Sequence, residues 1–212
     1  LYASFEDQFR GTRADIKARL KVYLPYLERA AVTGGVVDLG CGRGEWLEVL
    51  REAGEPARGV DRNRVTVEQC RARGFEVVEA DMLDYLRGLP ENSMRAVTAF
   101  HLIEHLPFQT LIDLLGEVLR VLAPGGLVIF ETPNPENLVV GASNFYLDPD
   151  HRNPLPSPLM HFLLETRGFC RVEVVKLNAN DAARVRETSD LALRFNDFMY
   201  GPLDYAVIGW KV

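Results

Sequence analysis

The chain has 212 residues, of which 47% are hydrophobic and 25% are charged, and its formal net charge is −6. This length and composition predict one globular domain over residues 1–212, and no apolar run approaches the roughly 18 residues that a membrane span needs. The acidic balance argues against nucleic acid as a partner, because proteins that bind it usually present a basic face.

The cysteines indicate a cellular compartment, and the first residue indicates how much of the protein the chain represents. Cys41, Cys70 and Cys170 have no paired spacing, which is typical of free thiols in the reducing cytoplasm. The chain begins at Leu1 rather than at Met, so we expect a trimmed or excised part of a longer protein.

Residues 1–33 are predicted to form a helical lead-in that covers one edge of the core. Thr12 is suited to cap the N-terminus of a helix, and Pro25 predicts a kink or a stop. Apolar residues recur at helical spacing at Ile16, Leu20, Tyr23, Leu24 and Leu27.

The stretch from Val36 to Gly44 predicts a buried strand, a glycine turn and the start of a helix. Asp38 precedes the glycines, in a D-x-G-x-G-x-G pattern, whereas a dinucleotide site has G-x-G-x-x-G. A carboxylate at this point repels phosphate and suits a cationic sulfonium, which favours S-adenosylmethionine as the cofactor. The alternative is a glycine-rich turn without a ligand, as in other α/β folds.

Two further strand ends extend this cofactor hypothesis. The strand from Ala57 to Asp61 ends on a carboxylate that can accept both hydroxyls of a ribose. After the strand from Glu76 to Ala80, Asp81 can meet an adenine amino group while Met82 packs against the ring. The alternative for Asp81 is a helix cap. We also expect Arg10 or Arg13 to reach the cofactor's carboxylate, since a guanidinium matches its two oxygens.

The remaining elements continue the alternation of strands and helices, which predicts parallel pairing through right-handed crossovers. A sheet core over residues 34–177 is followed by a polar, partly helical insertion at 178–203 and a last, antiparallel strand at 204–212. Residues 133–158 are rich in Pro, Asn and Asp and too long for a simple connector, which indicates a functional loop. Within the core we expect a strand at 95–100, a helix from 107, a break at 123–126, a strand at 127–133, a helix at 157–167 and a strand at 170–177.

Taken together, the motif at 36–44, Asp61, Asp81 with Met82, the LAPGG turn and the final strand pair resemble class I S-adenosylmethionine-dependent methyltransferases. The resemblance implies a Rossmann-like α/β fold with a seven-stranded, mostly parallel sheet in the order 3-2-1-4-5-7-6, strand 7 antiparallel and helices on both faces. It also implies cofactor contacts at Asp38, Gly40, Gly42, Asp61, Asp81 and Met82.

A narrower resemblance concerns the segment FRG-R in the lead-in and the segment DPDHRNPLP at 148–156. Both are similar to a bacterial subgroup encoded with, or fused to, glycosyltransferases that build surface polysaccharide. This implies a role in polysaccharide biosynthesis, with a glycosyltransferase as a fused or associated partner.

The segment HLIEHL predicts the site of chemistry. If it forms one helical turn, His101, Glu104 and His105 point the same way, and two imidazoles with a carboxylate outline a divalent-metal site. The pattern resembles the ExxEH metal motif of Hen-one-type small-RNA 2′-O-methyltransferases, which implies His151 as a further ligand. Histidine in place of their first glutamate leaves Mg²⁺, Mn²⁺, Fe²⁺ and Zn²⁺ open. The alternatives are a metal-free general base, His101 or His105, and ordinary histidines without a catalytic role.

These observations favour O-methylation of a sugar hydroxyl in a glycan or glycan precursor, with a metal that holds a diol and makes one hydroxyl more acidic. An RNA ribose methyltransferase would use a metal in the same way, but the net negative charge of the chain argues against an RNA substrate. A non-catalytic cofactor-binding module for a glycosyltransferase is the third reading. A nicotinamide oxidoreductase is disfavoured by the glycine spacing.

Overall fold

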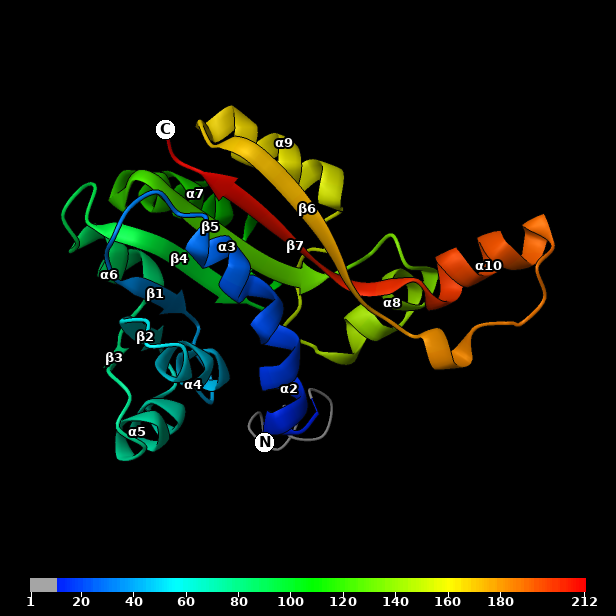
Figure 1. Cartoon of the computed structure of the whole chain (residues 1–212), viewed down its shortest axis with the longest axis horizontal. Helices are drawn as coiled ribbons and strands as arrows, with labels where there is room; N and C mark the ends of the chain where they lie inside the picture. The colour runs from blue at the N-terminus through cyan, green and yellow to red at the C-terminus, as the bar shows by residue number, and fades with distance from the viewer. Residues whose placement is uncertain (1–10) are drawn as a thin grey trace.

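A computed structural model of the chain describes residues 11–212, in which seven strands form one sheet in the order β3-β2-β1-β4-β5-β7-β6 (Figure 1). The pairs β1–β2, β2–β3, β1–β4 and β4–β5 are parallel, and β7 runs antiparallel to both β5 and β6. The predicted Rossmann-like order is confirmed. The strands are β1 Val36–Leu39, β2 Ala57–Asp61, β3 Val77–Glu79, β4 Met94–Phe100, β5 Leu122–Pro133, β6 Cys170–Ala179 and β7 Pro202–Trp210.

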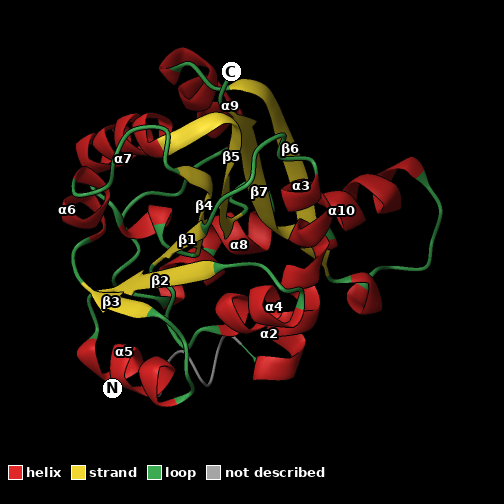
Figure 2. Ribbon diagram, turned by 60° about the vertical axis from the view of Figure 1, so that its left-hand side comes forward, coloured by secondary structure: helices red, strands yellow, loops and turns green. Residues whose placement is uncertain are grey.

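Helices cover both faces of the sheet (Figure 2). Because successive side chains of a strand point to opposite faces, Val97 and Ala99 of β4 join one core, while Ala96 and Phe100 join the other. The α-helices are α2 Arg13–Leu20, α3 Leu24–Glu28, α4 Glu45–Glu52, α5 Arg64–Ala72, α6 Met82–Arg87, α7 Phe108–Val121, α8 Leu138–Ala142, α9 Ser157–Arg167 and α10 Asp190–Tyr200. Short 3-10 turns are η1 Lys21–Tyr23, η2 Ile103–His105, η3 Asn144–Leu147 and η4 Asp181–Ala183.

The described part of the lead-in, from residue 11 to β1, is helical, as predicted, and Thr12 caps α2 by accepting a hydrogen bond from the Asp15 N–H. The predicted kink or stop at Pro25 is confirmed, because the helix is interrupted just before the proline, whose ring conflicts with the carbonyl four residues earlier. The chain tightens into η1, and α3 then begins with Pro25 in its first turn, where a missing backbone N–H costs nothing.

The predicted break of the helix at the LAPGG segment is confirmed, since α7 ends at Val121, but the segment already belongs to the sheet. Strand β5 already begins at Leu122, and its pairing with β4 shifts register between Met94 and Ala96. At Gly126 a side chain would come within 2.8 Å of the Arg95 carbonyl, so the bulge needs a bare backbone.

The insertion between β6 and β7 carries η4 and α10 and projects from the sheet (Figure 1). It is shorter than predicted, because β6 continues to Ala179 and β7 already begins at Pro202. Within residues 11–212, none of the helices combines the length and the apolar character needed to cross a bilayer.

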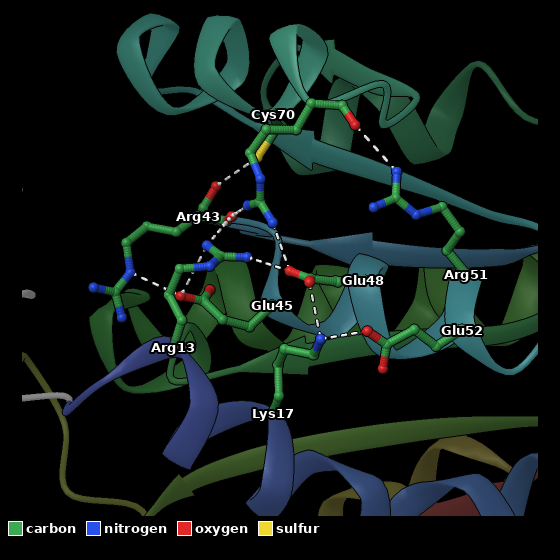
Figure 3. A network of polar contacts seen from close by, with 10 residues as sticks. Arg13, Lys17, Arg43, Glu45, Glu48, Arg51, Glu52 and Cys70 are labelled. Atoms are coloured by element: carbon green, nitrogen blue, oxygen red, sulfur yellow. Dashed lines mark hydrogen bonds and ion pairs between the residues drawn. The ribbon is translucent and has the colours of Figure 1, made fainter.

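An ionic network joins α2 to α4 and centres on Glu48 (Figure 3). The Glu48 carboxylate accepts from Arg13 at 2.7 Å, from Lys17 at 2.9 Å and from Arg73 at 2.5 Å. The hydrogen bond from Lys17, with those from Arg13 and Arg73, lowers the pKa of Glu48 to about 2 against the opposing effect of burial. The network therefore ties the lead-in to the helix that follows the glycine turn.

Glu48→Gln is expected to lower the free energy of unfolding at pH 7 by about 1–2 kcal/mol, since the carboxylate is partly exposed and screened. A carboxyl whose folded pKa is depressed stabilises the fold above its unfolded pKa, and this contribution is lost as the pH falls from about 4.5 toward 2. Urea unfolding at pH 7 and pH 3 should therefore show a smaller difference from wild type at the lower pH. Glu68→Gln, in an exposed pair with Arg64, is the control and should stay within about 0.5 kcal/mol; a pH-independent difference for Glu48→Gln would contradict this account.

Candidate functional site

The turn between β1 and α4 is built from glycines in left-handed conformations. Gly40, Gly42 and Gly44 have φ angles of 64°, 48° and 75°, a region that side chains rarely tolerate. A side chain at Gly40 would also meet Leu102 at 3.0 Å. The turn therefore presents bare backbone to whatever lies beyond the end of β1.

Carboxylates stand at or just beyond the ends of three neighbouring strands. Asp38 is 2% exposed and accepts a hydrogen bond from the Thr98 hydroxyl at 2.8 Å. Asp61 accepts from the Gly42 N–H at 2.9 Å and from the Asn63 N–H at 2.7 Å, so it fixes the glycine turn. These positions agree with a cofactor lying across β1 and β2, and the contacts themselves stay a prediction.

Asp81 takes the role that was the alternative for it. Its carboxylate caps α6 by accepting from the N–H groups of Leu83 and Asp84. Met82 is buried in the core. The cap does not test the predicted adenine contacts of Asp81 and Met82, which stay a prediction.

A cavity of about 420 Å³ opens beside the glycine turn. Asp38, Gly40 and Trp46 line one part of it, and His101, Glu131 and His151 are also among its lining residues. Of the described residues, the lining includes neither Asp61 nor Asp81 nor Met82. The predicted ribose and adenine contacts would therefore lie outside this cavity.

The predicted helical turn over HLIEHL is wrong in one respect. The 3-10 turn spans only Ile103–His105, and His101 precedes it with a φ of 54°, in the left-handed region. The His101 N–H donates to the Glu131 carbonyl at 2.9 Å, which holds this conformation. His101 still meets Glu104, with Nδ1 3.3 Å from Oε1, but it shares a group of possible ligand atoms with Glu131 and Asp204 rather than with His105.

Glu104, His105 and His151 do come together, with ligand atoms within 4.8 Å of one another. Glu104 is fully buried, and its Oε2 accepts from the Thr132 hydroxyl at 3.0 Å. Its Oε1 lies 3.3 Å from His101 Nδ1 and 3.9 Å from His151 Nε2. A buried carboxylate is costly unless its charge is compensated, and a cation between Glu104, His105 and His151 would compensate it.

His151 is oriented as histidine ligands of metals usually are. Its Nδ1 lies 2.6 Å from the Phe145 carbonyl, which can only accept, so Nδ1 carries the proton and the lone pair is on Nε2. Its ring lies 4.7 Å from that of His105, centre to centre. The donor set of one carboxylate and two imidazoles fits Mn²⁺, Fe²⁺ or Zn²⁺ and is less oxygen-rich than Mg²⁺ prefers.

His101 belongs to a second group, with two carboxylates that sequence analysis missed. Its Nε2 lies 3.3 Å from Glu131 Oε1 and 3.8 Å from Asp204 Oδ1, while its Nδ1 lies 3.3 Å from Glu104 Oε1. Burial alone would lower the pKa of His101, but hydrogen bonding to Glu104 and Glu131 and the charge of Asp204 outweigh it and raise that pKa to about 10. In this arrangement His101 is protonated at neutral pH.

Of the two carboxylates beside His101, one could have been predicted from the sequence. Glu131 interrupts the apolar run of β5 near its carboxyl end, where a buried charge needs a reason. Asp204 gave no comparable signal, because only the antiparallel pairing of β7 with β5 brings it beside the site.

The two candidate arginines of the lead-in have different outcomes. Arg10 lies outside the described residues. Arg13 donates to the Arg43 carbonyl at 2.8 Å and pairs with Glu45 and Glu48 of α4. The α4 carboxylates, rather than a ligand, thus occupy this guanidinium.

The sheet order, the glycine turn, the carboxylates at the strand ends and the adjoining cavity define the class of S-adenosylmethionine-dependent methyltransferases with a Rossmann-like fold. The family model of a methyltransferase domain matches residues 9–174, and the chain belongs to this family. S-adenosylmethionine is the cofactor of this class.

A solved structure and two curated proteins place the chain within the family. The crystal structure of a SAM-dependent methyltransferase from Archaeoglobus fulgidus has a TM-score of 0.92 and 32% sequence identity, with 99% of each chain covered. A probable S-adenosylmethionine-dependent methyltransferase of Mycolicibacterium smegmatis is 32% identical over 136 residues, which are 63% of this chain and 51% of that protein. A ubiquinone biosynthesis O-methyltransferase of Methylococcus capsulatus is 31% identical over 103 residues, 46% of this chain and 43% of that protein. The chain thus spans about half the length of the curated relatives it matches.

Proposed function

We propose that the chain transfers the methyl group of S-adenosylmethionine to a sugar hydroxyl of a glycan or glycan precursor, with a divalent cation held by Glu104, His105 and His151. The observation that carries this proposal is the grouping of the fully buried Glu104 with His105 and His151, whose ligand atoms all lie within 4.8 Å of one another. A cation bound there would hold neighbouring hydroxyls of the acceptor and lower the pKa of one of them.

The residues of the chain position the cofactor and the acceptor and exclude water. Asp38 and the glycine turn hold the cofactor at one part of the cavity, and the second and third strand ends fix its nucleoside. Phe145 packs against His151, with ring centres 4.7 Å apart, and the exposed Tyr146 stands beside it. Such an aromatic edge suits the apolar face of a sugar ring, and because the sulfonium is already activated, alignment provides most of the acceleration.

The alternatives have less support. The carboxylates around His101 make the cavity acidic, which disfavours the phosphates of an RNA acceptor. A non-catalytic assembly module would not need the buried Glu104 and its two imidazoles. We also propose a glycosyltransferase as the partner, fused or associated in the cytoplasm, on the basis of the loop that carries His151.

The test is methyl transfer from isotope-labelled S-adenosylmethionine to four kinds of acceptor: simple glycosides, nucleoside-diphosphate sugars, a catechol and a short RNA. We expect label on a sugar acceptor, its loss in excess chelator, and its return with added Mn²⁺. Label on the catechol or the RNA alone would overturn the sugar proposal, and undiminished transfer in chelator would overturn the cation.

His151→Ala is expected to abolish cation-dependent transfer and to weaken Mn²⁺ binding at this site at least 100-fold, because one of its ligands is gone. The affinity for S-adenosylmethionine should stay within about twofold, since His151 is on the acceptor side. Calorimetry with each ligand separates the two effects. His161→Ala, a histidine on the exposed side of α9, is the matched control and should leave all three readouts unchanged; equal losses in both variants would contradict the assignment.

A further inference from the structure

The cavity contains a second group of possible ligand atoms that no part of the proposed reaction uses. His101, Glu131 and Asp204 stand at the ends of β4, β5 and β7 that face the cavity, and all three line it. One ligand atom from each lies within 4.8 Å of the other two. Three elements far apart in sequence thus bring an imidazole nitrogen and two carboxylate oxygens to a common point.

Each member of this group has a partner on its far side. Tyr23 donates its hydroxyl to Glu131 Oε2, and Asn178 donates its amide N–H to Asp204 Oδ2 at 2.7 Å. Glu104 Oε1 stands 3.3 Å from Nδ1 of His101. The outer atom of each side chain is therefore engaged, while Nε2, Oε1 and Oδ1 face one another. Outer partners that orient ligands in this way are typical of metal sites.

The charges of the group do not balance within the described chain. Glu104, Glu131 and Asp204 lie 3.3, 3.3 and 3.8 Å from the nitrogens of one imidazole. Even a protonated His101 offsets only one of these three carboxylates, and an uncompensated buried charge is unfavourable. Glu104 has no exposed surface, and it shares this one imidazole with Glu131 and Asp204. Further positive charge is what the group needs.

We propose that His101, Glu131 and Asp204 form a second divalent-cation site, next to the one formed by Glu104, His105 and His151. Two carboxylates and one imidazole suit a hard ion such as Mn²⁺ or Mg²⁺. Glu104 stands between the two positions, close to a nitrogen of both His101 and His151. This second site lies in the same cavity as the proposed reaction. The proposal concerns cation binding alone, so its test needs no methyl acceptor.

The experiment is titration of the whole chain with MnCl2, with the free ion followed by its electron paramagnetic resonance signal and the heat by calorimetry. Wild type is expected to bind two Mn²⁺ per chain. Glu131→Gln should retain one, with the affinity of the other at least 100-fold weaker, and His151→Ala should also retain one. The double variant should bind none. Glu165→Gln, an exposed glutamate of α9, is the matched control and should bind two.

The outcomes separate this inference from the proposed function. A single Mn²⁺ lost in His151→Ala but kept in Glu131→Gln would overturn the second site and leave the first. A single ion with the opposite response would support the site of His101, Glu131 and Asp204 and overturn the cation of the proposed function. Wild type without bound Mn²⁺ would overturn both. If Glu131→Gln loses its native circular dichroism, Asp204→Asn, which keeps the volume of the side chain, takes its place.

Discussion

Asp61→Ala is expected to weaken the binding of S-adenosylmethionine by about 100-fold, measured by calorimetry. Asp61 accepts hydrogen bonds from the Gly42 and Asn63 N–H groups, so its loss frees the glycine turn and also removes the predicted contact to the ribose. Hydrogen bonds to a charged group contribute about 1.5–3 kcal/mol, which corresponds to roughly 10- to 150-fold in affinity. Mn²⁺ binding should be unchanged, because Asp61 does not line the cavity.

Glu79→Ala is the matched control for this prediction. Glu79 is the residue of β3 paired in register with Asp61, and it is exposed. Its removal should leave the affinity for S-adenosylmethionine within about twofold. A comparable loss in both variants would mean that Asp61 acts only through the overall negative potential of this edge of the sheet.

Trp46→Ala is expected to lower the free energy of unfolding by about 3–5 kcal/mol, the range for deleting a large buried aromatic side chain. Trp46 is 2% exposed, and its ring packs edge-on against Tyr23 and Phe100, with centres 6.2 and 5.5 Å away. It therefore joins α4 to the lead-in and to β4. Urea unfolding followed by circular dichroism measures the change.

Phe162→Ala removes an aromatic side chain that is 60% exposed on α9 and should change the stability by less than about 0.5 kcal/mol. A loss below 1 kcal/mol for Trp46→Ala would show that the lead-in and α4 are not packed as described.

Local chemistry made much of the fold predictable. The bounds of β2 and α9 agree with the sequence prediction to the residue, because each ends on a clear signal: Asp61 before a cap, and Gly168 after Arg167. The order of the strands was available only through the family resemblance, since pairing across the sheet leaves no mark in any single segment.

The candidate site was predictable only where its residues are near one another in sequence or follow a motif. Glu104 and His105 are adjacent, and the loop motif pointed to His151. The orientation of His101 was not predictable, because it depends on a left-handed φ of 54° that the Glu131 carbonyl stabilises from another strand. The role of Asp204 was not predictable for a related reason. Strand β7 enters the sheet between β5 and β6, after a long intervening segment of the chain.

The buried hydroxyl of Tyr23 sets a limit on how far this enzyme can be shortened. Tyr23 lies ahead of the first strand, yet its hydroxyl donates to Glu131, which lines the cavity. A minimal version cut back to the sheet and its crossover helices would keep every strand and still lose this support of Glu131. Chimeras that exchange loops around the cavity between relatives should therefore inherit this upstream segment together with the fifth strand.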